Sequence, residues 1–278
     1  MDEKYSIDVN DKKIHWSQDV SYGDYLQLGQ LLNCHQPRSE QHDEHLFIII
    51  HQISELWMKL ALIEMRAAAR AIANNELDPA FKMMSRVAKI QEQLINAWDV
   101  LISMTPADYV SFRESLGQSS GFQSFQYREM EFLLGNKNAK MVEAHANMRV
   151  RYQHLKSVLH QPSIYDVTLQ LLAKRGFIIP KEYTERDWSQ PYRPHPDIEQ
   201  AWLQVYRNTD TYWDLYELAE KLVDAEYSFQ QWRFSHMKTV ERIIGFKRGT
   251  GGTAGVHYLK QALELKFFPE LWSVRTLM

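Results

Sequence analysis

Two histidines in apolar helical patterns are the residues of this chain best suited to chemistry. His236 stands in the segment W-R-F-S-H-M-K-T-V-E-R-I-I, which leads into a basic, glycine-rich stretch from Gly245 to Gly255. His51 follows Phe47 by four residues, so the two side chains share one helix face. A neutral imidazole in such surroundings can bind a metal or a haem iron, but it can also be a core histidine that hydrogen-bonds to a neighbour. The histidines alone leave both alternatives open.

The other potential metal ligands in the sequence restrict the kinds of metal site that the histidines could form. The sequence contains no H-E-x-x-H or E-x-x-H, the signatures of zinc proteases and di-iron bundles, and no C-x-x-C-H for covalent haem. Its one cysteine, Cys34, excludes a paired-cysteine metal site and an internal disulfide. A non-covalent haem needs only one axial histidine, which His236 could supply.

Polar groups that could hold a charged ligand occur in two further stretches. Tyr109 and Arg113 are four residues apart, and a phenol beside a guanidinium could clamp a carboxylate; a surface arginine paired with an acid is the alternative. The stretch L-G-Q-S-S-G-F-Q-S that follows could bring hydroxyls close to a ligand or be an ordinary linker. The glycine-rich stretch lacks the G-x-x-x-x-G-K-[ST] order of a nucleotide phosphate loop, so it better fits a flexible cover whose Thr250 faces an anionic group.

The composition is that of a globular protein. The 278 residues are 45% apolar and 24% charged, and the net charge of −3 argues against a nucleic-acid-binding protein. We expect no signal peptide and no segment that approaches a membrane span. Together with the single cysteine, these features predict a cytoplasmic protein with neither a nucleic acid nor a membrane as partner.

The elements that must position these residues are all predicted to be helices. Apolar residues recur at three- and four-residue steps, and capping residues, prolines and glycines mark the boundaries. An irregular connection is predicted from Phe177 to Pro194, and a break near Asn208. The predicted helices run from Asp43 to about Asn74, Asp78 to about Met104, Thr105 to Gly117, Phe122 to Leu134, Lys140 to about His160, Ser163 to Arg175, Asp197 to Gly245 and Val256 to Lys266.

These segments predict an all-α fold, a helical bundle of about ten helices. No internal repeat and no domain boundary is evident, so we expect one domain over residues 1–278, with residues 1–20 as an N-terminal arm.

Several of these segments together resemble the bacterial type of tryptophan 2,3-dioxygenase. The resemblance runs in order from about Tyr22 to the C-terminus. It is carried by H-D-E-H-L-F-I-I-I-H-Q-I-S-E-L-W-M-K-L, F-R-E-S-L-G-Q-S-S-G-F-Q-S-F-Q-Y-R, F-L-L-G-N-K-N, Q-W-R-F-S-H-M-K-T-V-E-R-I-I-G-F-K-R-G-T-G-G-T-A-G-V and F-F-P-E-L-W. It implies an enzyme with one haem b per subunit that inserts both atoms of O₂ across the C2–C3 bond of L-tryptophan. The product would be N-formylkynurenine, formed in the first step of tryptophan catabolism by the kynurenine pathway.

The resemblance also implies a role for each candidate residue. His236 would be the axial iron ligand, and His51 would accept a hydrogen bond from the indole N–H. Arg113 and Tyr109 would bind the substrate carboxylate. Residues implied in further contacts with the substrate are Phe47, Leu116 and Thr250; those implied on the haem side are Ser120, Gly121 and Trp98.

Finally, the resemblance implies a homotetramer, a dimer of dimers, in which Tyr22, Tyr25 and Leu26 complete the site of a neighbouring subunit. Two other functions remain open on the sequence alone. A helical haem carrier or sensor would need His236 without the carboxylate clamp, and an indoleamine dioxygenase would also accept tryptamine.

Overall fold

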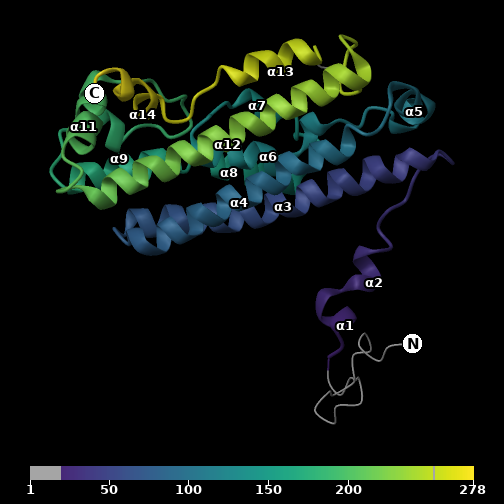
Figure 1. Ribbon diagram of the computed structural model, residues 1–278, viewed down its shortest axis with the longest axis horizontal. Helices are drawn as coiled ribbons and strands as arrows, with labels where there is room; N and C mark the ends of the chain where they lie inside the picture. The colour runs from purple at the N-terminus through teal and green to yellow at the C-terminus, as the bar shows by residue number, and fades with distance from the viewer. Residues whose placement is uncertain (1–19, 253) are drawn as a thin grey trace, which may run out of the picture.

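Three long helices form the centre of the molecule. The computed structural model describes residues 20–252 and 254–278, and within them all regular structure is helical (Figure 1). Helix α4 (Leu77–Leu101) packs against both α3 (His42–Ala73) and α12 (Trp213–Ile244). The all-α prediction is therefore confirmed, and the long helices coincide with the predicted ones to within a few residues at each end.

The buried face of α4 shows why these segments pair. Its buried side chains follow three- and four-residue steps along the whole helix, so they form one apolar stripe that contacts α3 and α12. They are Leu77, Ala80, Phe81, Met84, Val87, Ile90, Gln91, Leu94, Ala97, Trp98 and Leu101. The stripe places Trp98 in the last turn of α4, at the end of the bundle where the predicted site residues lie.

Shorter helices cover this core. They are α5 (Pro106–Phe112), α6 (Phe125–Leu134), α8 (Arg149–Leu159), α9 (Ile164–Lys174), α11 (Pro196–Arg207) and α13 (Val256–Leu263). Helix α5 begins as predicted, because Thr105 and Asp108 form a capping box and Pro106 occupies the first helical position. The part predicted to continue this helix to Gly117 is a tighter 3₁₀ turn, Arg113–Leu116, and a second such turn, Gly121–Gln123, precedes α6.

One predicted helix is wrong. The segment from Lys140 to His160 forms two helices, α7 (Lys140–Glu143) and α8, separated by a turn. Nothing in the local sequence A-H-A-N marks a break. His145 in the turn is fully buried and so is Val142 three residues before it, which indicates that tertiary packing decides the break.

The remaining helices are pieces of four or five residues that the sequence pattern does not reveal. They are α1 (Tyr22–Leu26), α2 (Leu28–Leu31), α10 (Lys181–Thr184) and α14 (Pro269–Ser273). Apart from α10, the connection from 177 to 194 is irregular as predicted.

A buried ion pair fixes α12 against its neighbours. The guanidinium of Arg233 donates to the carboxylate of Glu131 on α6 (2.5 Å) and to the carbonyl oxygen of Ala262 at the end of α13 (2.9 Å). Both charged side chains are buried, and Glu131 also pairs with the buried Arg128, so removing Glu131 would leave two buried guanidinium groups without their carboxylate. Because His236 lies one turn beyond Arg233, this contact also sets the register of the candidate site.

The N-terminal part of the described chain departs from this bundle. Helices α1 and α2 lie away from the body in Figure 1. Their side chains Tyr22, Tyr25 and Leu26 are exposed, the two tyrosines by 75% and 79%. The predicted arm over residues 1–20 falls outside the described residues, except for Val20.

The expectation that no segment approaches a membrane span needs a correction. Helix α3 is long and apolar enough to cross a membrane by length and composition, a test that core helices of soluble proteins also pass. It packs against α4, α5, α6 and α9. Its outer face nevertheless leaves Ile53, Leu56 and Ile63 between 38% and 51% exposed in the single chain.

Candidate active site

Three long helices bring two histidines and an indole together. His51 comes from α3, Trp98 from α4 and His236 from α12. The Trp98 ring stacks on the His236 ring, with centroids 4.6 Å apart and planes within 8° of parallel. It meets the His51 ring edge-on at 6.4 Å. With Trp232, whose ring lies 5.6 Å from that of His236, these residues form what we call the histidine pocket.

His51 is held as a neutral hydrogen-bond acceptor. Its Nδ1–H donates to the carbonyl oxygen of Phe47 (2.7 Å), which leaves Nε2 with a free lone pair. Burial lowers the pKa of His51, although the Phe47 carbonyl and the Glu55 carboxylate partly oppose this effect. At neutral pH the imidazole is therefore uncharged, and its Nε2 atom can accept a hydrogen bond.

His236 is also neutral, and it is free to bind a ligand. Burial, with a smaller contribution from His51, lowers its pKa from 6.5 to about 4. Among the described residues no side chain or carbonyl makes a hydrogen bond with its ring. A neutral imidazole with an available nitrogen is what an iron ligand requires.

An aromatic wall continues from the histidine pocket toward α5. The Phe47 ring lies 4.2 Å from that of His51, 6.0 Å from that of Tyr109 and 5.7 Å from that of Phe112. Tyr109 and Phe112 are almost fully buried, and Phe47 is partly exposed. Flat aromatic ligands suit a wall of this kind.

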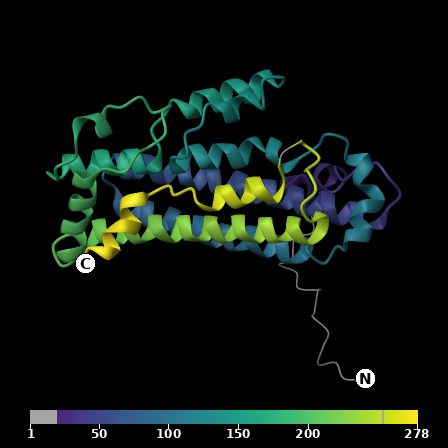
Figure 2. The same ribbon diagram turned by 90° about the horizontal axis from the view of Figure 1, so that it is seen from above.

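Next to the wall, the carboxylate clamp of Tyr109 and Arg113 meets the glycine loop, Gly245–Gly255, which is described except for residue 253. In both views this loop lies at the same end of the bundle as α5 (Figure 1, Figure 2). Arg113 Nη2 donates to the carbonyl oxygen of Arg248 (2.9 Å), and Thr250 Oγ1 donates to that of Ser119 (2.5 Å). Burial raises the pKa of Tyr109, so its phenol stays protonated at neutral pH.

The loop approaches the Ser119–Ser120 segment so closely that a glycine is required. A Cβ atom added to Gly251 would lie 2.6 Å from Ser120 Cβ and 2.8 Å from Ser120 Oγ. Only a residue without a side chain can occupy this position while the loop is docked. The sequence stretches predicted to face a ligand, some 130 residues apart, are thus in contact.

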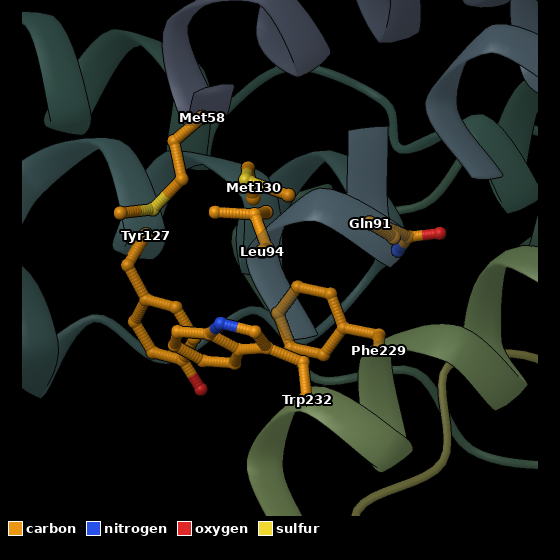
Figure 3. A pocket seen from close by; sticks show the side chains of 7 residues that line it. All are labelled: Met58, Gln91, Leu94, Tyr127, Met130, Phe229 and Trp232. Atoms are coloured by element: carbon orange, nitrogen blue, oxygen red, sulfur yellow. The ribbon is translucent and has the colours of Figure 1, made fainter. Parts of the chain in front are cut away.

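A small cavity lined in part by Trp232 lies away from the predicted site residues. Its volume of about 10 Å³ has room for no more than one water molecule. Figure 3 shows the ring of Trp232 beside Tyr127 and Phe229 in its lining, which also includes Met58, Gln91, Leu94 and Met130. This cavity contains none of the predicted site residues and is too small for an amino acid.

Comparison with known proteins identifies the family to which this arrangement corresponds. The model of the tryptophan 2,3-dioxygenase family matches residues 6–278. The chain is 56% identical to a tryptophan 2,3-dioxygenase of Burkholderia pseudomallei strain 668 over 264 residues, which cover 95% of this chain and 86% of that protein. It is 54% identical to tryptophan 2,3-dioxygenase 1 of Ralstonia nicotianae over 267 residues, which cover 96% of this chain and 91% of that protein.

The chain belongs to the tryptophan 2,3-dioxygenase family. The resemblance noted in the sequence is thereby confirmed.

The structure of this family member brings most of the predicted site residues to one end of the bundle. Leu116 is partly buried against the core, and Ser120 caps the 3₁₀ turn that starts at Gly121. The predicted residues Tyr22, Tyr25 and Leu26 are not brought to the site of their own chain, since these side chains are exposed and helix α1 lies away from the described bundle in Figure 1.

Two aromatic side chains of this dioxygenase-family site are not among the predicted ones. Phe112 contacts both Phe47 and Tyr109, and Trp232 contacts both Trp98 and His236. Helical spacing could have found them, because Phe112 is three residues after Tyr109 and Trp232 is four before His236.

Proposed function

We propose that this chain is a haem-dependent tryptophan 2,3-dioxygenase. It cleaves the indole C2–C3 bond of L-tryptophan with O₂, gives N-formylkynurenine and so begins tryptophan catabolism by the kynurenine pathway. Family membership over nearly the whole chain supports the reaction. The observation that matters most within the structure is that two neutral histidines from α3 and α12 face one aromatic pocket beside an arginine.

The histidine pocket fits a haem by the chemistry of its donors. His236 offers an unprotonated nitrogen, and the buried indole N–H groups of Trp98 and Trp232 have no partner among the described residues, so they can donate to a bound group. We assign iron ligation to His236 and further haem contacts to Trp98, Ser120 and Gly121. When bound, haem b, one per subunit, supplies the binding and activation of O₂.

The chain's own residues position the substrate. Phe47 stacks on the indole ring, and His51 Nε2 accepts a hydrogen bond from the indole N–H, because Nδ1 already donates to the Phe47 carbonyl. An orienting bond is enough here, since the indole N–H is a poor acid. Fixing the ring between two contacts of this kind lowers the entropic cost of reaching the reactive geometry.

The amino-acid end of the substrate meets the clamp. The Arg113 guanidinium binds the carboxylate, the Tyr109 phenol adds a second donor, and Thr250 contacts the carboxylate and ammonium. Leu116 packs against the substrate. Because Arg113 also donates to the loop carbonyl of Arg248, substrate binding and loop docking share one side chain. The docked glycine loop keeps water from the reacting groups.

We further propose that the whole chain of residues 1–278 acts as one domain, and that four copies assemble as a dimer of dimers. Buried apolar side chains from Ile50 to Val274 belong to one cluster, which supports a single core. The exposed tyrosines of α1 and the apolar outer face of α3 support burial against other copies. In that assembly Tyr22, Tyr25 and Leu26 would complete a neighbour's site, and the protein would be cytoplasmic.

The test is to mix the reduced, haem-loaded protein with L-tryptophan and O₂ and to measure N-formylkynurenine. Tryptamine, which lacks the carboxylate, serves as the matched control substrate. We expect product from L-tryptophan and almost none from tryptamine. A protein that binds haem without forming product would instead be a haem carrier, and equal turnover of both substrates would contradict the role of the clamp.

A further inference from the structure

The ring of His236 lacks the hydrogen bond that usually fixes the orientation of a metal-binding histidine. Histidines that bind metals usually donate their other ring N–H to a carboxylate or carbonyl, which fixes the plane of the ring. Among the described residues, no side chain or carbonyl accepts a hydrogen bond from the His236 ring, and the restraint on its plane that the structure shows is packing by neighbouring rings.

Trp98 provides the closest and best-aligned packing surface. Its ring is parallel to that of His236 within 8°, at a centroid distance of 4.6 Å. Such offset stacking is among the favoured geometries of aromatic pairs. Rotation of the imidazole about its Cβ–Cγ bond would drive its edge into the indole face, so the stack opposes this rotation.

Trp98 is itself held firmly enough to act as a template. It lies in the last turn of α4, is only 9% exposed, and also contacts the rings of His51 and Trp232. Its Nε1–H has no hydrogen-bond partner among the described residues. Packing from three helices, rather than a hydrogen bond, therefore sets its position.

We propose that Trp98 is the positioning residue of the axial ligand. It fixes the plane of the His236 imidazole by stacking, in place of the usual hydrogen bond. This inference depends on the proposed function, because it takes His236 as the iron ligand, and it goes further by assigning to Trp98 an action on that ligand. Trp98 acts through His236 and not on the substrate.

The neighbouring Trp232 offers a matched control. It is just as buried as Trp98 and its ring lies 5.6 Å from that of His236, but the two planes are tilted by 40°. Trp232 lines the small cavity of Figure 3, whereas the Trp98 ring contacts the rings of both histidines and of Trp232. A tilted ring beside a cavity restrains the imidazole less than a parallel one.

The experiment replaces the His236 side chain by free imidazole, so that the axial ligand is no longer attached to the polypeptide. The variant His236→Gly is loaded with haem in the presence of imidazole, which replaces the missing side chain, and the shift of the haem absorption band over a range of imidazole concentrations gives the dissociation constant. We expect the double variant His236→Gly/Trp98→Leu to bind imidazole about 3- to 10-fold more weakly than His236→Gly, the loss expected for one aromatic pair. The double variant His236→Gly/Trp98→Phe keeps a ring and should recover most of this affinity. The double variant His236→Gly/Trp232→Leu should change it less than about twofold.

Each result bears on the proposal. Equal imidazole affinity with Trp98 and with Leu at position 98 would overturn it, and so would an equal loss in the Trp98 and Trp232 variants. Should the leucine variant fail to fold, methionine, a flexible side chain without a ring, takes its place at position 98, and an imidazole affinity equal to that of His236→Gly would again overturn the proposal. A single variant His236→Gly that keeps its axial ligation without imidazole would instead refute the proposed function itself.

A second readout uses the native ligand. In the ferrous Trp98→Leu protein, the iron–histidine stretching band in the resonance Raman spectrum should broaden, because the imidazole plane is no longer fixed. Trp98→Phe should restore a narrow band. An unchanged band in Trp98→Leu would contradict the proposal.

Discussion

The histidine pocket and the clamp with its glycine loop are built in opposite ways. His51, Trp98 and His236 come from three long helices, and the buried ring of Trp98 contacts the rings of both partly buried histidines. The clamp comes from the short helix α5 and the 3₁₀ turn after it, and the glycine loop is a connection; Arg113 donates to the loop carbonyl of Arg248, and Thr250 in the loop donates to the carbonyl of Ser119. Helices hold the first region rigidly, while the second is joined by a few partly exposed polar contacts.

The different construction of the two regions suits their different roles, cofactor binding in the histidine pocket and substrate binding at the clamp. A cofactor ligand must be neutral and fixed: desolvation lowers the pKa of His236 and keeps its ring neutral, and the stack on Trp98 restrains it. A substrate has to enter and leave, so the groups that bind its charged end belong on elements that can separate at low cost. Changes in the first region should therefore affect haem, and changes in the second should affect substrate.

The largest effect is expected from His236→Ala. No other histidine among the described residues lies opposite His51, so this variant should lose stable haem binding and with it all activity. Haem content is measured from the absorption spectrum of the purified protein. A variant with the spectrum of the parent would show that the histidine pocket is not the cofactor site.

Arg113→Ala should impair substrate binding without affecting haem binding, and so distinguish the clamp from the histidine pocket. Removing a charged hydrogen bond to a carboxylate costs about 1.5–3 kcal/mol, so kcat/KM for L-tryptophan should fall about 10- to 100-fold, mainly through KM. Haem content should stay that of the parent. Arg248→Ala is the control, because Arg248 contributes only its backbone carbonyl to this contact. An unchanged KM in Arg113→Ala would remove the clamp from the site.

Gly251→Ala tests the docking of the loop. The added Cβ would overlap Ser120, so the closed loop should be destabilised and kcat/KM should fall about 10-fold, the equivalent of roughly 1.4 kcal/mol. Adding Ser120→Gly removes the obstructing atoms, and the double variant should recover part of the loss. Equal activity of Gly251→Ala and the parent would show that the loop need not dock on Ser120 during turnover.

The smallest effect concerns pH. Burial lowers the pKa of His51 below 6.5, so its Nε2 stays an acceptor at neutral pH and becomes protonated only in acid. We expect kcat/KM to be level from about pH 6.5 to 8 and to fall several-fold as the pH drops further. Tyr109 should not titrate in this range, because burial raises the pKa of its phenol above 10. A rise in kcat/KM toward acid pH would contradict a neutral His51.

Much of the fold follows from local patterns. Three- and four-residue apolar spacing predicts the long helices, and the Thr105–Pro106 start signal predicts α5. The break between α7 and α8 is not predictable in this way, because it depends on the burial of His145 by distant parts of the chain. Short helices such as α1 and α10 have too few residues to show a period.

The site shows the same limit. Residue types and motif resemblance predict which side chains take part, from His51 to Thr250. They do not predict that Trp98 stacks on His236, or that Gly251 meets Ser120, because these pairs are more than 130 residues apart. Phe112 and Trp232 differ in this respect, because their helical spacing from Tyr109 and His236 could have indicated them.

The sequence by itself determined the helical class, the family and the kinds of group that the site contains, because periodicity, capping and motifs are properties of neighbouring residues. Only the tertiary structure decided the protonation of the histidines, the stack on Trp98 and the closure of the loop over Ser120. Burial, ring geometry and close contact depend on segments that are distant in the sequence and adjacent in the fold, so the local sequence pattern does not predict them.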